Sequence, residues 1–270
     1  MTVPPLEASS KLDCVTPPSV VTEAIVVRLV DYGEADRIAT LLTRDAGKIS
    51  ALVRSARKSR KRFGGVTLFG LGQASLRPRG GELWALDAFD AGRGFPGISL
   101  DVARVAYAAY VCELARELCA AEAADARLYD LVRETLGRID AGSCGPVALR
   151  CFELALLDAL GLAPALDRCV ACGGAPADEA GQVLDVAHGG VVCGGCAHGR
   201  GRPLGGAVRQ ALVAAQAGSE VDAAARWALL SPPDAASARD TLQALLGAHL
   251  TRPLRSVEFI AKLNAQAAHG

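Results

Sequence analysis

Aromatic residues are scarce in this sequence, since Phe, Trp and Tyr together make up 4% of its 270 residues. Ala and Leu must therefore fill most of any interior, and such a composition favours helices over a β-sandwich. Hydrophobic residues nevertheless make up 51% of the chain, which excludes a disordered tail. The chain is long enough to bury a real core, in either two modest domains or one large one.

Long apolar runs are also missing, and none approaches the roughly 20 residues that a bilayer-crossing helix needs. We therefore expect no membrane among the partners. Residues 1–20 contain four prolines and have no apolar centre, so we expect a disordered lead-in there and not a signal peptide. Nine cysteines without a signal indicate reduced thiols, metal binding in preference to disulfides, and a cytoplasmic location.

Catalytic motifs are a third absence. The sequence has no Walker A loop, no HExxH, no G-x-S-x-G elbow and no dinucleotide fingerprint after an expected strand. Glu113 and Glu117 are carboxylates four residues apart, but such a pair on an amphipathic helix is usually part of a solvated face. The four histidines lie in glycine-rich or terminal segments. We therefore expect a protein that is not an enzyme.

Residues 21–97 contain five segments with strand character, separated by turn signals. Their apolar residues are β-branched or alternate with polar ones, as half-buried strands require. The expected strands are residues 23–30, 37–44, 48–54, 66–77 and 82–89. Five short strands in about 75 residues predict a small OB-fold barrel. One half of a simple β-sandwich is the competing interpretation.

From residue 98 the hydrophobic period becomes helical, and residues 98–270 predict a mainly α-helical domain. The first helix is expected to be capped by Ser99 or Asp101. Its expected apolar face consists of Val102, Val105, Ala109, Cys112 and Cys119. Further helices are expected at residues 127–139, 146–161, 205–216 and 237–250, with a cysteine-containing insertion at 165–200. The predicted fold class is therefore α+β.

Four of the cysteines form two CxxC pairs, Cys169 with Cys172 and Cys193 with Cys196, separated by twenty residues. Zn²⁺ takes four thiolates at the corners of a tetrahedron, about 2.3 Å from the metal, and each CxxC turn brings two sulfurs to one side. Adjacent glycines allow tight turns that direct N–H groups at the sulfurs. The spacing predicts one structural zinc ion per chain, without an open coordination position. Free thiols or redox-active pairs are the alternative.

Other candidate ligands are expected to play no part in this site. His188 and His198 lie nearby in the sequence, but four cysteines already saturate a tetrahedral centre. The remaining cysteines are expected to be core residues or incidental: Cys14, Cys112, Cys119, Cys144 and Cys151.

A run of six cations without an acid occupies residues 54–62. Like charges at this density repel one another, so the segment stays extended or mobile until an anion neutralises it. Phosphate backbones do so by releasing counterions. Residues 23–97 carry thirteen Arg or Lys against eight Asp or Glu, so positive charge is concentrated in this region. The expected phosphate contacts are Arg54, Arg57, Lys58, Arg60, Lys61 and Arg62.

Aromatic residues near the run are ambiguous. Phe63, Phe69 and Trp84 either stack on bases or belong to the core, and for Trp84 the apolar strand around it favours the core. The basic run itself has a plainer interpretation, as a solvated loop without a function or as a patch for a membrane surface.

Particular residues resemble the RecO family of bacterial recombination mediators, from about residue 23 to residue 263. The N-terminal marks are Tyr32-Gly33-Glu34, Asp36-Arg37, Gly47-Lys48 and the basic run from Ala56-Arg57 to Arg62-Phe63-Gly64-Gly65. Residues 152–173, 188–196 and 250–260 are similar to the family's C-terminal half. The departures are Ser55, where a glycine is common, Lys61, where a serine is usual, and residues 66–72, which lack a proline-phenylalanine pair. Zinc cysteines vary within the family.

The resemblance implies an N-terminal OB-fold, a helical C-terminal domain and a zinc-bearing insertion. It also implies a protein that binds single- and double-stranded DNA, anneals complementary strands and hydrolyses no nucleotide. Cooperation with RecR and with the single-stranded-DNA-binding protein, to help RecA load onto gapped DNA, is implied in the same way.

Three classes of function follow from these patterns. A non-enzymatic DNA annealing and loading factor is preferred. An RNA-binding or transcription-linked protein is the alternative, because OB-folds and zinc ribbons also occur in that class. A zinc-using enzyme of nucleic-acid modification is the third, and a closed four-cysteine site argues against it.

Overall fold

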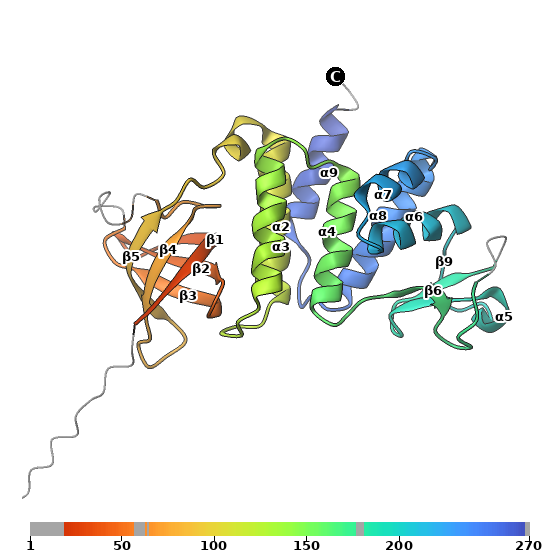
Figure 1. The fold of residues 1–270 in the computed structure, drawn as a ribbon, viewed down its shortest axis with the longest axis horizontal. Helices are drawn as coiled ribbons and strands as arrows, with labels where there is room; N and C mark the ends of the chain where they lie inside the picture. Colours follow the sequence, from red (N-terminus) through yellow and green to blue (C-terminus); the bar gives the residue numbers. More distant parts are fainter. Residues whose placement is uncertain (1–18, 57–62, 64, 177–180, 268–270) are drawn as a thin grey trace, which may run out of the picture.

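The structure, a computed structural model, describes residues 19–56, 63, 65–176 and 181–267 (Figure 1). A β-barrel is followed by helices, and a small sheet is inserted among the helices. In Figure 1 the barrel lies on one side of the pair α2 (Val102–Leu118) and α3 (Ala126–Asp140), and the small sheet lies at the opposite end of the molecule. Within these residues, no helix combines the length and the apolar character that crossing a membrane requires.

Five strands close into the barrel: β1 (Val20–Tyr32), β2 (Asp36–Thr43), β3 (Gly47–Val53), β4 (Leu71–Arg77) and β5 (Trp84–Ala91). Their order is β1-β2-β3-β5-β4, with β3 and β5 parallel and the other pairs antiparallel. Alternate apolar side chains fill the interior, among them Val26, Leu41 and Ile49. The predicted five-stranded OB-fold barrel is confirmed, because the sheet closes on itself.

The strand β4 begins at Leu71, whereas the sequence indicated residue 66. Residues 66–70 are apolar but form turns, in which the Gly70 N–H donates to the Thr67 carbonyl at 2.9 Å. Phe69 has a φ of +65°, which no strand permits. Val66 is buried in the barrel core instead. Phe69 packs against the helical core, so the apolar residues of this stretch are not the alternating side chains of a barrel strand.

The short helix η1 (Pro96–Leu100) leads from the barrel to the helical part. After α2 and α3 follow α4 (Pro146–Ala159), α6 (Gly206–Gln216), α7 (Glu220–Trp227), α8 (Pro232–Gly247) and α9 (Arg255–Ala267). Of the two predicted caps of α2, Asp101 is the N-cap. Its carboxylate accepts hydrogen bonds from the Ala103 N–H at 2.6 Å and the Arg104 N–H at 3.2 Å.

The helix α2 is buried more completely than its sequence indicated. The predicted apolar face is wrong at its start, because Val102 is 58% exposed. Every residue from Tyr110 to Ala115 is buried, because α2 contacts the barrel, α3 and α9. A helix surrounded in this way has no solvated face over that stretch, so a one-sided pattern cannot describe it.

The predicted solvated face at Glu113 and Glu117 is also wrong. The Glu113 carboxylate accepts from the Ser256 backbone N–H at 2.8 Å and from its hydroxyl at 2.6 Å. Glu117 accepts from the guanidinium groups of Arg116 and Arg252, each at 2.6 Å. Both carboxylates therefore hold the C-terminal segment against α2. The sequence pattern did not predict that α9 would pack opposite them.

The barrel is fixed to the helices by apolar and polar contacts. Ile25, Val27 and Leu42, on the outer face of the barrel, belong to the same buried cluster as the helical core. Arg44 binds Asp130 of α3 with two hydrogen bonds, at 2.6 and 3.0 Å. These contacts make the barrel and α2–α3 one packed unit.

The insertion carries a four-stranded sheet in the order β6-β8-β7-β9. Its elements are β6 (Ala165–Cys169), β7 (Val183–Asp185), β8 (Gly190–Val192), the short helix α5 (Gly194–Ala197) and β9 (Arg202–Pro203). Cys169, Val192 and Ala197 form its own small core. Leu166, Leu184 and Val191 of the same sheet are buried in the helical core instead, so the insertion is also packed against the helices.

Candidate nucleic-acid interface and metal centre

The basic run begins just after β3, where Arg54 is exposed. Its other predicted phosphate contacts lie outside the described residues and stay predictions: Arg57, Lys58, Arg60, Lys61 and Arg62. The described ends of the run are anchored, because the Ser55 N–H donates to Asp36 at 2.7 Å and Phe63 is buried in the barrel core. Ser55 has a φ of +53°, a conformation that favours glycine and accounts physically for the glycine expected there.

Between the ends of the run lies a cavity of about 240 Å³, here called the arginine pocket. Three arginines line it, Arg54, Arg77 and Arg79, together with apolar residues that include Phe63 and Leu86. Arg77 binds Asp87 through two hydrogen bonds, at 3.0 and 3.1 Å, and the bonds to this carboxylate raise the pKa of Arg77. Arg54 and Arg79 are exposed, so the pocket keeps an excess of positive charge.

Arg77 and Arg79 are the residues that the sequence analysis missed. They flank Pro78 between β4 and β5, where the sequence indicated only the end of a strand at Arg77 and a turn at Arg79. The signal was available, because the loop between strands 4 and 5 is one of the two loops that OB-folds use to bind oligonucleotides. The closed barrel places this loop beside Arg54.

The aromatic residues near the run have distinct positions. Phe63 is 6% exposed and belongs to the core, so it offers no stacking face. Trp84, for which the sequence favoured the core, is half-buried and packs against the barrel core, and its indole N–H donates to Glu122 at 2.9 Å. Phe69 is half-buried against the helical core. Tyr32, which the sequence analysis did not single out for stacking, is 54% exposed at the end of β1.

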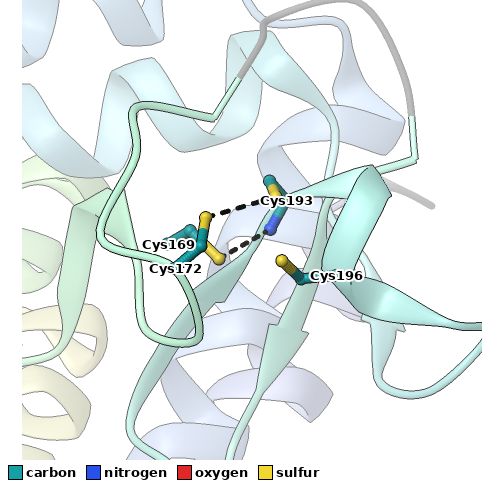
Figure 2. Close-up of side chains that lie close together, drawn as sticks. All are labelled: Cys169, Cys172, Cys193 and Cys196. Atoms are coloured by element: carbon teal, nitrogen blue, oxygen red, sulfur yellow. Dashed lines mark hydrogen bonds between the residues drawn. The ribbon is translucent and has the colours of Figure 1, made fainter.

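The four predicted cysteine ligands come together in the insertion (Figure 2). Cys169 ends β6 and Cys172 lies in the turn after it, while Cys193 and Cys196 lie at the start of α5. All four sulfurs lie within 4.8 Å of one another, and those of Cys172 and Cys193 are 3.9 Å apart. Ligands about 2.3 Å from a tetrahedral zinc ion are separated by about 3.8 Å, so the cluster fits that ion.

Electrostatics in the cluster also suit a cation. The Cys193 backbone N–H donates to the Cys169 sulfur at 3.3 Å, and this bond lowers the pKa of the Cys169 thiol to about 6. Crowding acts in the opposite direction at Cys196, whose pKa is raised to about 12 by hydrogen bonds with Cys193 and Cys172. Thiolates at this spacing repel one another, and a bound cation removes that repulsion.

The other candidates lie apart from the cluster. His188 binds Asp185 at 2.8 Å, and His198 follows α5. Cys112 and Cys119 are buried, as expected, and burial raises the pKa of Cys112 to about 12 and that of Cys119 to about 11. Cys144 and Cys151 are half-buried against the helical core, and Cys14 lies outside the described residues.

Comparisons with known proteins cover nearly the whole of this architecture. Residues 19–91 match the family described as recombination protein O N terminal, and residues 99–258 match recombination protein O C terminal. These two matches coincide with the barrel and with the helical part including its insertion.

Three proteins named DNA repair protein RecO illustrate the likeness. The one from Anaeromyxobacter dehalogenans (strain 2CP-C) is 44% identical over 243 residues, covering 88% of this chain and 94% of that protein. The one from Myxococcus xanthus is 37% identical, covering 89% and 96%. The one from Geobacter sulfurreducens is 37% identical, covering 89% and 97%. The closed barrel, the helical part with its cysteine cluster and these matches together lead to one conclusion: the chain belongs to the RecO family of DNA repair proteins.

Proposed function

We propose that this chain is a non-enzymatic mediator of DNA repair and recombination. It binds single- and double-stranded DNA, anneals complementary single strands, and helps RecA load onto gapped DNA, in the cytoplasm at the bacterial nucleoid. The observation that carries the proposal is the arginine pocket on a closed five-stranded barrel, at the base of the basic run.

The pocket and the run supply what binding to a single strand requires. Arg54 and Arg79 offer guanidinium groups that bind phosphate oxygens in pairs, and the run adds further cations. Tyr32 adds an exposed ring on which a base stacks. Contacts of this kind hold the sugar-phosphate chain and leave base edges free, so a second strand can pair with the first.

We assign the cysteine cluster a structural Zn²⁺. Cys169, Cys172, Cys193 and Cys196 together fill its coordination sphere, so no position is left for a substrate or a water molecule. The ion would join the turn after β6 to the start of α5, and its role is to stabilise the insertion. The same closed site argues against zinc chemistry on nucleic acid.

Strand annealing without ATP tests the proposal most directly. Complementary oligonucleotides, coated with the single-stranded-DNA-binding protein of the same bacterium, should pair faster when this chain is added. Affinities for single-stranded DNA and RNA of equal length separate the preferred function from the alternative. A strong preference for RNA would assign the chain to the RNA-binding class.

Variants of the basic residues test where DNA contacts this chain. Replacing Arg54 and Arg79 with Ala should weaken binding of all sequences alike and reduce the salt slope by about 0.7 for each lost phosphate contact on a single strand. Replacing Arg57, Lys58, Lys61 and Arg62 together should reduce it by several times that amount. The control is Arg127→Ala, which removes an exposed cation on α3 that is paired with Asp158. An unchanged slope in both variants would place the footprint elsewhere.

The proposed protein partners are RecR and the single-stranded-DNA-binding protein. The helical part contains a cavity of about 590 Å³ between α2, α4, α8 and α9, which we call the helical cavity. It is lined by Tyr107, Trp227 and Ile260 and by the buried Arg150. Nη2 of Arg150 binds the buried Glu153 at 2.6 Å, and within the described residues its Nε and Nη1 have no hydrogen-bond partner. An apolar peptide that brings a carboxylate suits such a cavity.

Filling the helical cavity tests whether the single-stranded-DNA-binding protein binds there. Ala236→Phe places a ring in the cavity and should weaken that protein's binding in calorimetric titrations at least tenfold. Ala155→Phe, on the exposed side of α4, is the control and should leave binding unchanged. Equal affinities in the two variants would move the contact to another surface.

A further inference from the structure

A second cleft lies where the barrel meets the helices, and we call it the junction cleft. It has a volume of about 330 Å³. The strand β1 contributes Arg28, α9 contributes Arg255 and Phe259, and the loop before β4 contributes Leu68 and Phe69. These residues come from opposite ends of the sequence, and only the fold brings them together.

The junction cleft carries two arginines that have no ion-pair partner in the part of the chain that the structure describes. Arg28 and Arg255 are exposed, and neither has a carboxylate within 4.0 Å among the described residues. The third cation, Arg116, is paired with Glu113 and Glu117. Glu258 and Lys262, both exposed further along α9, offset each other. Two free guanidinium groups at one cleft favour an anionic ligand with more than one charge.

The junction cleft also contains an exposed aromatic ring. Phe259 is 41% exposed, and Leu68 beside it is 45% exposed, in a protein with few aromatic residues. An exposed phenylalanine flanked by arginines suits a base and its phosphates, because every base has a face that stacks. A ligand that is only a phosphate would gain nothing from these side chains.

The backbone around Arg28 is shaped for this position. The register of β1 against β2 shifts between Val26 and Arg28, which marks a β-bulge. The bulge lets Val27 enter the helical core while Arg28 stays exposed at the cleft. The facing loop is held firmly, because the Phe69 N–H donates to the Val26 carbonyl at 2.9 Å and the Val26 N–H to the Gly70 carbonyl at 2.8 Å.

The order of strands separates the junction cleft from the arginine pocket. The cleft lies on β1, whose neighbours in the barrel are β2 and β4. The arginine pocket draws on the ends of β3 and β4 and on β5. In the cyclic order β1-β2-β3-β5-β4, the β3–β5 pair lies across the barrel from β1. The two sites share no lining residue, although β4 of the arginine pocket is a direct neighbour of β1.

We infer that the junction cleft is a second binding site for single-stranded nucleic acid, with Arg28 and Arg255 on its phosphates and Phe259 against a base. The inference rests on the proposed function, since the arginine pocket and the basic run are taken to hold the first strand. Two strands on one chain have a high effective concentration relative to each other, which speeds their meeting.

A bridging experiment with two non-complementary oligonucleotides tests the inference. A biotinylated oligo-thymidine on beads is incubated with the full chain and a fluorescent oligo-thymidine, and the fluorescence captured is measured. The wild type should capture it in proportion to protein concentration. The double variant Arg28→Ala with Arg255→Ala, and the single variant Phe259→Ala, should each reduce capture about tenfold. Affinity for one oligonucleotide, measured by anisotropy, should change less than twofold.

The control removes the same charge elsewhere, with Arg127→Ala and Arg226→Ala, and should bridge like the wild type. Thermal melting checks that each variant is folded. Bridging that survives in the folded double variant overturns the inference, and so does bridging that rises with the square of protein concentration, which indicates dimers. A wild type that binds no single strand at all would instead overturn the proposed function.

Discussion

Replacing Glu113 should loosen α9 from the rest of the protein. The Glu113 carboxylate accepts hydrogen bonds from the backbone N–H and hydroxyl of Ser256, and the Arg255 N–H also bonds to it. These N–H groups belong to the first turn of α9, where no carbonyl within the helix accepts them. Glu113, more than a hundred residues away in the sequence, therefore caps this helix.

The size of the effect follows from burial and charge. The Glu113 side chain is 11% exposed, and a hydrogen bond to a charged group contributes about 1.5–3 kcal/mol. Contributions within one cluster do not add fully, so Glu113→Ala should lower the free energy of unfolding by about 3 kcal/mol. Glu113→Gln keeps one oxygen acceptor and loses the charge, so its loss should be about 1–2 kcal/mol. Glu134→Ala, at an exposed position on α3, is the control.

The pH dependence has a definite sign. Burial raises the pKa of Glu113, but the bonds from Ser256 and Arg255 and the charge of Arg116 outweigh it, so the folded value lies below the ordinary 4.5. The ionised cap therefore contributes fully above pH 4.5 and loses its contribution as pH falls through the folded pKa. The difference in stability between wild type and Glu113→Gln should be constant near neutral pH and shrink below pH 4.5.

Urea unfolding at several pH values, followed by circular dichroism, measures these differences, and hydrogen exchange of the α9 amides shows where the structure opens. In Glu113→Ala the α9 amides should exchange much faster than those of α3. The reasoning is refuted if Glu113→Ala is as stable as Glu134→Ala, or if α9 keeps its protection. Because α9 carries Arg255 and Phe259, loss of the cap should also reduce bridging of two strands.

Three further predictions concern the metal and the backbone. Metal analysis should find about one zinc per chain. The Cys193→Ser variant should lose the zinc and unfold its insertion more easily before its DNA binding is affected. A stable variant that loses only its DNA affinity would contradict this order. Gly47→Ala should lower the unfolding free energy by more than 2 kcal/mol, because φ is +70° and a Cβ would lie 2.3 Å from the Ala123 carbonyl oxygen. The control is Gly80→Ala, where φ is +74° but the surrounding space is open, and its unfolding free energy should fall by only about 1 kcal/mol. Ser55→Gly should gain up to about 1 kcal/mol in urea unfolding, since φ is +53°, and a clear loss would show that the strain is absent.

Local patterns carried the parts of the fold that the sequence predicted well. Strand alternation depends on neighbouring residues only, and it located the five strands of the barrel. It failed at residues 66–70, which form turns, with Val66 in the barrel core and Phe69 against the helical core. The helical period likewise located α2 but misjudged its faces, because a period reports which residues are apolar and not how many neighbours surround the helix.

By itself, the sequence determined the four cysteines of the cluster and the position of the basic run. Two CxxC turns and a cluster of like charges are properties of short segments, and the fold of the insertion brings Cys169 and Cys193 together. Only the tertiary structure decided which distant residues share a surface. Arg77 and Arg79 joined Arg54 because the barrel closes, and Arg255 reached Arg28 because α9 packs on α2. The sequence around a charged residue does not show whether water or another helix lies opposite it. That is decided by how the helices and strands pack.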